Sequence, residues 1–202
     1  MKQLNEKEAE NFLEKNKFKV VKRQVIKEQE QLKRIKIKFP IVMKASGKNI
    51  NHKRSMGGVI LNVKTKEQAE KAFHQLKKIK GCQEIMIQPQ LSGEELILGL
   101  KQTPEFGLVI LLGKGGSNVE KEKDVSFRAT PIDKKEVQIM FKELRAHKFL
   151  KNKINEKLLI NNLLKFSKLA KKYKTKIQEL DINPLIINQK NATIVDARII
   201  LN

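Results

Sequence analysis

The chain has 202 residues, of which 40% are apolar, and this is enough for one large domain or for two small lobes with cores of their own. Lysine and arginine outnumber aspartate and glutamate by 43 to 22, which gives a formal net charge of +21. No apolar run is long enough to cross a membrane, the N-terminal segment is too charged for a signal peptide, and the single cysteine, Cys82, cannot form an internal disulfide. These features exclude a membrane-spanning or disulfide-stabilised protein and favour a cytoplasmic location.

The excess positive charge suggests a polyanionic partner, either nucleic acid or an anionic membrane surface. Two features of the composition oppose that interpretation. Lysine is much more common than arginine, and aromatic residues make up only 5%, with no tryptophan and one tyrosine. Because no base-stacking platform is evident, a lysine-rich solvated surface ranks ahead of nucleic-acid binding.

The first 40 residues contain three short elements. Asn5, followed three residues later by Glu8, predicts a capping box at the start of a helix. Phe18–Val21 has the composition of a strand, and Lys27–Ile35 predicts a weak helix made mostly of charged residues.

Two apolar strands are expected on either side of a basic, glycine-containing loop within Phe39–Val63. Glycine lets backbone N–H groups approach an anion closely, and lysine and arginine neutralise its charge, so this arrangement suits a phosphate group. A histidine in the same loop can also accept or pass on a phosphoryl group. The residues concerned are Lys44, His52, Lys53, Arg54, Gly57 and Gly58.

The next segment alternates between predicted helices, strands and turns. Thr65 and Gln68 are expected to cap a helix whose buried face carries three apolar residues at helical spacing. Further strands are expected at Glu84–Leu91, Glu94–Lys101, Leu108–Leu112 and Val125–Ala129. The Leu108–Leu112 run is continuously apolar, which predicts a central strand buried on both faces, and it leads into a second glycine loop at Gly113–Gly116.

The last third of the chain begins with a predicted helix capped by Asp133. Lys142–Lys176 contains twelve Lys or Arg and two Glu, and its apolar residues recur at helical spacing, so it predicts an amphipathic helix with a very basic outer face. Two strands are expected to close the chain as a hairpin: Ile177–Ile187, interrupted by Asn183-Pro184, and Ala192–Leu201. This mixture of helices and strands predicts an α/β or α+β fold.

Asn183 and Asp196 lie on the two strands of that hairpin, so that their side chains can converge. One carboxylate and one amide oxygen are a common protein contribution to a Mg²⁺ site, because Mg²⁺ retains several water molecules and phosphate oxygens as ligands. An Asp and an Asn on a hairpin are by themselves ordinary turn or solvent-facing residues. Their interpretation as a metal site depends on the other motifs.

Six segments in order resemble the ATP-grasp subunit of the ADP-forming acetate–CoA ligases, the nucleoside-diphosphate-forming acyl-CoA synthetases. They are FPIVMK, NINHKRSMGGVILNV, IMIQPQLSGEELILGLKQTPEFG, LLGKGGSNVEKEKDVSFRATPI, ELDINPLII and VDARI. The similarity extends from about Phe39 to Ile199. Each segment alone is a weak signal, whereas their order and spacing are specific. The related succinyl-CoA synthetase beta subunits share the closing Asn-Pro…Asp pattern, but the loops match the acyl-CoA synthetases better.

The resemblance implies an α+β ATP-grasp fold with two lobes, a smaller one over about 16–88 and a larger one over 89–202 that includes the N-terminal helix. It implies that ATP or ADP binds between the lobes with Mg²⁺. The implied reaction is acyl-CoA + ADP + phosphate giving acid + CoA + ATP. Because the chain has no CoA-binding domain and no phosphohistidine segment of its own, the resemblance also implies a heteromer with an alpha subunit that carries both.

The resemblance further implies roles for individual residues. Lys44 would contact the nucleotide phosphates, and His52 would relay the phosphoryl group. Nucleotide contacts would come from Gln88, Pro89, Gln90, Leu91, Glu95 and Lys101. The two phosphate loops would contribute Lys53, Gly57, Gly58, Gly113, Gly115, Gly116 and Glu120. Asn183 and Asp196 would be the Mg²⁺ ligands.

Two alternatives remain open. The first is a basic RNA-associated protein without catalytic activity, with Lys142–Lys176 as its contact surface. The second is an ATP-grasp carboxylate ligase that acts alone, for which no carboxylate site can be located in the sequence. The sequence does not specify the acid, the preference for ADP over GDP or the subunit stoichiometry.

Overall fold

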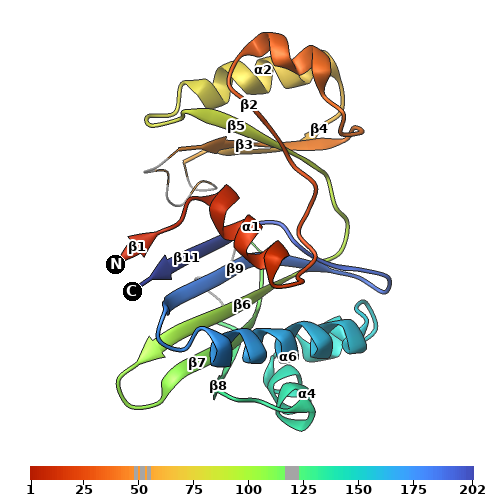
Figure 1. Cartoon of the computed structure of the whole chain (residues 1–202). Coiled ribbons are helices and arrows are strands. Elements are labelled where there is room, and N and C mark those ends of the chain that lie inside the picture. The colour runs from red at the N-terminus through yellow and green to blue at the C-terminus, as the bar shows by residue number, and fades with distance from the viewer. Residues whose placement is uncertain (48–49, 51–52, 54–55, 117–122) are drawn as a thin grey trace. The chain divides into compact units, whose positions relative to one another are not determined.

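Helices and antiparallel sheets are combined in a computed structural model that describes residues 1–47, 50, 53, 56–116 and 123–202 (Figure 1). Within these residues the chain forms two compact units. The smaller unit comprises Val21–Leu91, and the larger unit comprises Met1–Val20 and Ser92–Asn202. The predicted α+β class is confirmed.

The smaller unit is a four-stranded antiparallel sheet in the order β2-β5-β3-β4, with helix α2 packed against it (Figure 1). Its apolar core joins α2 to β3 and β5. The predicted helix at Lys27–Ile35 is a shorter 3-10 helix, η1. The elements are β2 (Gln24–Ile26), η1 (Gln29–Arg34), β3 (Ile41–Ser46), β4 (Val59–Val63), α2 (Lys66–Lys77) and β5 (Glu84–Pro89).

Helix α2 begins where the sequence places it. The side chain of Thr65 accepts a hydrogen bond from the backbone N–H of Gln68 at 3.2 Å, which satisfies one of the unpaired donors of the first helical turn. The predicted apolar residues Ala69, Phe73 and Leu76 are all buried. This prediction is confirmed.

The larger unit contains a seven-stranded antiparallel sheet in the order β1-β11-β9-β6-β7-β8, with β10 also paired to β9. Helices α4 and α6 pack on each other, α4 contacts β8, and α6 contacts β9 and β10 (Figure 1). The elements are β1 (Lys2–Gln3), α1 (Glu6–Lys15), β6 (Glu94–Thr103), β7 (Gly107–Lys114), β8 (Val125–Ala129), α4 (Lys134–Glu143), α5 (His147–Leu150), α6 (Glu156–Lys172), β9 (Ile177–Ile187), β10 (Ala192–Ile194) and β11 (Ala197–Leu201).

Local capping signals also start the helices of the larger unit. Asn5 and Glu8 form the predicted capping box of α1, each side chain accepting from the other residue's backbone N–H at 2.9 Å. Asp133 caps α4 by accepting from the backbone N–H of Glu136 at 2.8 Å. The helix predicted within Lys142–Lys176 is shorter than expected, because α4 ends at Glu143, α5 is a separate short helix, and Asn155 caps α6 over Glu156–Lys172. Helix α6 buries one apolar side and exposes lysines on the other, as its periodicity predicts.

Four strand predictions are wrong in detail. Phe18–Val21 is not a strand, because only Val20 forms an isolated bridge, to Ile194. Strand β7 is not buried on both faces: Leu108, Ile110 and Leu112 enter the core, whereas Val109 and Leu111 between them are half-buried. The expected strand Ala192–Leu201 is divided into β10 and β11 by a break that contains Asp196. Strand β9 continues through Asn183-Pro184 without the expected interruption, because the residues on both sides remain paired with β6.

Candidate functional site

Lys44, the predicted phosphate-contacting lysine, lies in β3, one of the two inner strands of the smaller unit's sheet. Lys44 pairs in register with Val59 of β4 and Met86 of β5, and only 4% of its surface is exposed. Burial of an ammonium group carries a desolvation cost, so lysine is rarely buried to this extent as a merely solvated residue. The position is therefore unusual for a structural lysine, and its contact with phosphate stays a prediction.

The first glycine loop begins after β3 and ends at β4, as predicted. The backbone N–H of Gly58 donates to the carbonyl of Lys53 at 2.7 Å, and a Cβ atom at Gly58 would lie only 2.9 Å from that oxygen. Gly57 has a φ of +69°, which favours glycine. Close approach of the backbone thus requires glycine at position 58, and the left-handed conformation favours glycine at position 57. His52 lies outside the described residues.

The predicted nucleotide-contacting residues Gln88–Leu91 form the end of the smaller unit, since Ser92 begins the second segment of the larger one. Gln88 is fully buried. The backbone N–H of Gln90 donates to the carbonyl of Pro40 at 2.9 Å, and its side-chain oxygen accepts from the N–H of Asn62 at 3.2 Å. The Gln90 backbone donor is therefore used inside the smaller unit.

The second glycine loop leaves β7 in contact with the start of β6. The N–H of Gly115 donates to the carbonyl of Glu95 at 2.7 Å, and a Cβ atom at Gly115 would lie 2.8–2.9 Å from the carbonyl carbon, the oxygen and the Cβ of Glu95. Gly113 is similarly close to Val125, and Gly116 has a φ of +120°. The glycines at these positions hold the loop against the strand. Glu120 lies outside the described residues.

Asn183 and Asp196, the predicted Mg²⁺ ligands, are neighbours in the larger unit. The backbone N–H of Asn183 donates to the carbonyl of Asp196 at 3.1 Å, and the next hydrogen bond along joins the N–H of Val195 to the carbonyl of Pro184, also at 3.1 Å. Asn183 is exposed and Asp196 is half-buried. The two residues are thus brought together from β9 and from the break before β11, while their role as ligands stays a prediction.

Asp181, which sequence reasoning missed, lies beside this pair. It faces Gly99 of β6 on one side and Arg198 of β11 on the other, on the sheet face opposite to the core residues Leu180 and Ile182. Burial raises the pKa of Asp181 to about 6, Arg198 opposes that rise, and Asp196 adds to it. The alternation of buried and exposed residues along β9 could have indicated the sheet face on which Asp181 lies. Its neighbours Gly99 and Arg198 could not be predicted, because they depend on strand register.

Lys101, the predicted basic residue of β6, lies on the same face and is exposed. Its register partner in β9 is Glu179, and Glu179 also accepts a hydrogen bond from the guanidinium of Arg198. A row of alternating charges therefore crosses β6, β9 and β11 near Asp196. In the part of the chain that the structure describes, no group of three or more His, Cys, Asp or Glu side chains is arranged to hold a metal ion.

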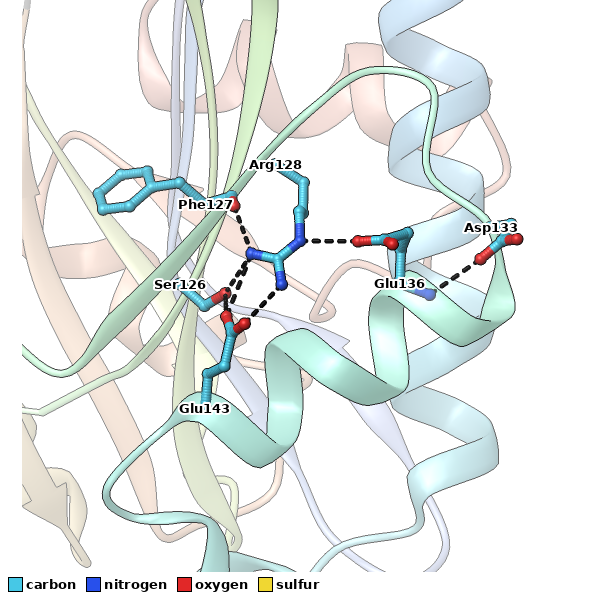
Figure 2. A network of polar contacts seen from close by, with 6 residues as sticks. All are labelled: Ser126, Phe127, Arg128, Asp133, Glu136 and Glu143. Carbon is cyan, nitrogen blue, oxygen red and sulfur yellow. Dashed lines mark hydrogen bonds and ion pairs between the residues drawn. The ribbon is translucent and has the colours of Figure 1, made fainter.

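A polar network fixes strand β8, which follows the second glycine loop, to helix α4 (Figure 2). The guanidinium of Arg128 donates to Glu136 at 2.7 Å and to Glu143 at 2.5 and 3.1 Å. Ser126 donates to Glu143 at 2.5 Å. The hydrogen bonds from Arg128 and then from Ser126 lower the pKa of the Glu143 carboxyl. This network attaches β8, the strand that follows the second glycine loop, to helix α4.

Comparison with known proteins identifies this arrangement of elements. A family model described as an ATP-grasp domain matches residues 1–201. The chain is 37% identical to the beta subunit of acetate–CoA ligase [ADP-forming] II of Pyrococcus furiosus, over 82% of this chain and 76% of that subunit. The chain belongs to the ATP-grasp family of ADP-forming acetate–CoA ligases. The family resemblance and the ATP-grasp fold predicted from the sequence are therefore confirmed.

Other members of this ligase family are longer. Acetate–CoA ligase [ADP-forming] II of Archaeoglobus fulgidus is 36% identical over 98% of this chain, which spans only 30% of that protein. The chain thus covers about a third of a single-chain relative and about three quarters of a separate beta subunit.

The solved structures agree with the family assignment. A dinucleotide-forming acetyl-coenzyme A synthetase of Ca. Korarchaeum cryptofilum, in complex with coenzyme A and Ca-AMPCP, has a TM-score of 0.88 and 31% identity over all of this chain and 94% of that chain. The same protein with Mg-AMPPCP, described with its phosphohistidine segment pointing towards the nucleotide binding site, has a TM-score of 0.82. No helix among the described residues is long and apolar enough to cross a membrane.

Proposed function

We propose that the chain is the ATP-grasp subunit of an ADP-forming acyl-CoA ligase. The overall reaction is acyl-CoA + ADP + phosphate giving acid + CoA + ATP, and it is reversible. In the half-reaction assigned to this subunit, the P–N bond of a phosphohistidine breaks and a new P–O bond forms to the terminal phosphate oxygen of ADP. The observation that carries this proposal is the match of 82% of the chain to the beta subunit of such a ligase, within an ATP-grasp domain that covers residues 1–201.

The proposal includes a partner subunit. Two relatives from Pyrococcus furiosus are named as beta subunits, which supports a partner subunit for this chain. That partner would bind coenzyme A and carry the phosphohistidine, as the description of the Korarchaeum protein indicates for that enzyme. The single cysteine is compatible with a reducing cytoplasmic location, which is also part of the proposal.

The residues present fit a Mg²⁺–nucleotide. Asn183 and Asp196 supply one amide and one carboxylate oxygen from adjacent backbone positions, the small ligand set that Mg²⁺ accepts when phosphates complete its coordination. Bound Mg²⁺ would neutralise phosphate charge during the transfer. Lys44 and Lys101 would bind phosphate oxygens, and the two glycine loops would present backbone N–H groups to them. In this proposal His52 relays the phosphoryl group.

The two alternatives are less well supported. A protein that only binds RNA does not account for the match of residues 1–201 to an ATP-grasp domain. A ligase that acts alone would need a carboxylate site, and the beta-subunit relative is part of a heteromeric enzyme by its name.

Calorimetric titration with Mg·ADP tests the proposal on the wild type, Asp196→Ala and Glu105→Ala. Glu105 is an exposed carboxylate in the β6–β7 turn, so its substitution is a control for lost negative charge. We expect the wild type and Glu105→Ala to bind Mg·ADP and Asp196→Ala to lose most of that binding. A wild-type protein that does not bind Mg·ADP refutes the proposed function.

A further inference from the structure

A groove of about 430 Å³ lies in the larger unit, beside helix α6 and the strand pair β9–β10. One wall is a stripe of α6 that runs from Leu158 through Asn161 and Lys165 to Lys168, spaced at three or four residues. The opposite wall comes from Lys19 and from the turn before β10. The groove is thus built from three segments that are far apart in the sequence. None of these residues belongs to the proposed nucleotide site.

Four lysines line the groove and keep their positive charge uncompensated. They are Lys19, Lys165, Lys168 and Lys190. Among the described residues none of the four forms an ion pair with a carboxylate, whereas Lys153 elsewhere in the unit pairs with Glu94 at 3.3 Å. Like charges that share a groove repel one another, so an anion bound among them is favoured.

Two of these lysines are held in place by neutral acceptors. The Lys19 ammonium donates to the side-chain oxygen of Asn191 at 2.5 Å, and the Lys165 ammonium donates to the carbonyl of Lys17 at 3.0 Å. Such contacts orient the side chain without cancelling its charge. The groove therefore presents positive charges that are partly preorganised.

The remaining lining indicates which kind of anion fits. Asn161, Asn162 and Asn191 contribute amide groups, and Leu158 and Leu164 contribute apolar contact. Protein–protein interfaces are depleted in lysine and enriched in aromatic residues, and this groove has the opposite composition. Interfaces with nucleic acids are polar and positively charged, and the amides and leucines suit ribose and base edges. The lining thus favours a nucleic-acid strand over an acidic protein.

The length of the groove agrees with a short strand. From Leu158 to Lys168 the helix advances ten residues, or about 15 Å at 1.5 Å per residue. A single strand laid along this length places a few phosphates between the lysines of α6 and those of the other two segments. No aromatic side chain lines the groove, so base stacking would not contribute sequence preference.

We propose that the groove between α6 and the β9–β10 turn binds the phosphate backbone of single-stranded RNA, independently of sequence and of the nucleotide site. If the four lysines each neutralise one phosphate, the logarithm of the binding constant falls with the logarithm of salt concentration with a slope of about −2.8. Affinity then drops about 50-fold between about 50 and 200 mM salt.

The test is fluorescence polarisation with a labelled oligo(U) of about 12 nucleotides, within the length that single-strand-binding sites cover. Lys165→Gln/Lys168→Gln should reduce the slope to about −1.4, a drop of only about 7-fold over the same salt range. Lys165→Arg/Lys168→Arg should keep the wild-type slope. Lys148→Gln/Lys151→Gln removes two exposed lysines of the same unit outside the groove and should also keep it.

Three results would overturn the inference. One is an equal loss of slope in both glutamine double variants, which would show diffuse binding over the basic surface. Another is no RNA binding at about 50 mM salt. The third is tighter binding of an oligoglutamate peptide of similar charge. Mg·ADP titration of the same variants provides the folding check and keeps a failure here distinct from a failure of the proposed function.

Discussion

Substitution of Gly115 by alanine should disrupt the second glycine loop more than substitution of any glycine that merely occupies a turn. Gly115 approaches β6 so closely that an added Cβ would lie 2.8–2.9 Å from backbone and Cβ atoms of Glu95, against 3.4–4 Å for ordinary contact. Because two of the three neighbours are backbone atoms in a paired strand, they cannot rotate away. The loop itself would have to move by about half an ångström or more.

The cost follows from two terms. Forced overpacking in a well-packed region typically costs about 1–3 kcal/mol. Displacement of the loop also weakens the hydrogen bond of 2.7 Å from the Gly115 N–H to the Glu95 carbonyl, whose net contribution is about 1 kcal/mol. Together they amount to about 3 kcal/mol, which corresponds to a decrease in Tm of roughly 6–12 °C for a chain of this size.

The assay is thermal unfolding followed by circular dichroism, together with Mg·ADP titration. Gly107→Ala is the matched control, because Gly107 has a φ of +67° and nothing within 4 Å of its added Cβ. Gly107→Ala should be destabilised only by the cost of the left-handed backbone conformation for alanine, about 1–2 kcal/mol, and should keep its affinity for Mg·ADP. The close-approach argument is refuted if Gly115→Ala unfolds at the wild-type Tm, or if its Tm decreases less than that of Gly107→Ala.

Further substitutions at four residues probe the site and its support. Arg128→Met combined with Glu143→Gln in a double-mutant cycle should give a coupling energy of about 1 kcal/mol by urea unfolding, and a value of zero would show that the pair contributes nothing. The folded-state pKa of Glu143 is lowered, so its contribution to stability is present above the unfolded pKa and is lost as the pH falls through the folded pKa. Glu143→Gln should therefore weaken the decrease in the free energy of unfolding at acidic pH. Asp124→Ala should cost about 2–4 kcal/mol, since its buried carboxylate accepts two backbone N–H groups at 2.7 and 2.9 Å, and Asp124→Asn should cost less. Lys44→Met should lower Mg·ADP affinity by roughly 10- to 100-fold in calorimetry, and an unchanged affinity would remove Lys44 from the nucleotide site.

Local features of the chain were readable from sequence because their causes are local. The capping residues Asn5, Thr65 and Asp133 act within three residues of themselves, and all three begin helices as predicted. The apolar spacing of α6 likewise reports directly which side of the helix is buried. Segments with a weak local preference were less predictable: Phe18–Val21 has strand-like composition but finds no strand to pair with beyond one bridge at Val20.

The family could also be recognised from sequence, because its motifs occur in a fixed order with fixed spacing. The glycine positions were predicted as a phosphate loop, but the reason that Gly115 must be glycine is its approach to Glu95, twenty residues earlier. Asn183 and Asp196 were predicted to converge, and a backbone hydrogen bond joins them, although the break in the strand at Asp196 was not predicted.

The sequence by itself determined the helix starts, the amphipathic sides and the order of the family motifs, since each depends on residues within a few positions of one another. Only the tertiary structure decided that β7 is buried on one face, that Asp181 lies between Gly99 and Arg198, and that lysines from three distant segments share one groove. Strand register and long-range packing bring together residues whose separation in sequence carries no signal of contact. For that reason the basic face of Lys142–Lys176 was visible in the sequence, but the addition of Lys19 and Lys190 to Lys165 and Lys168 in one groove was not.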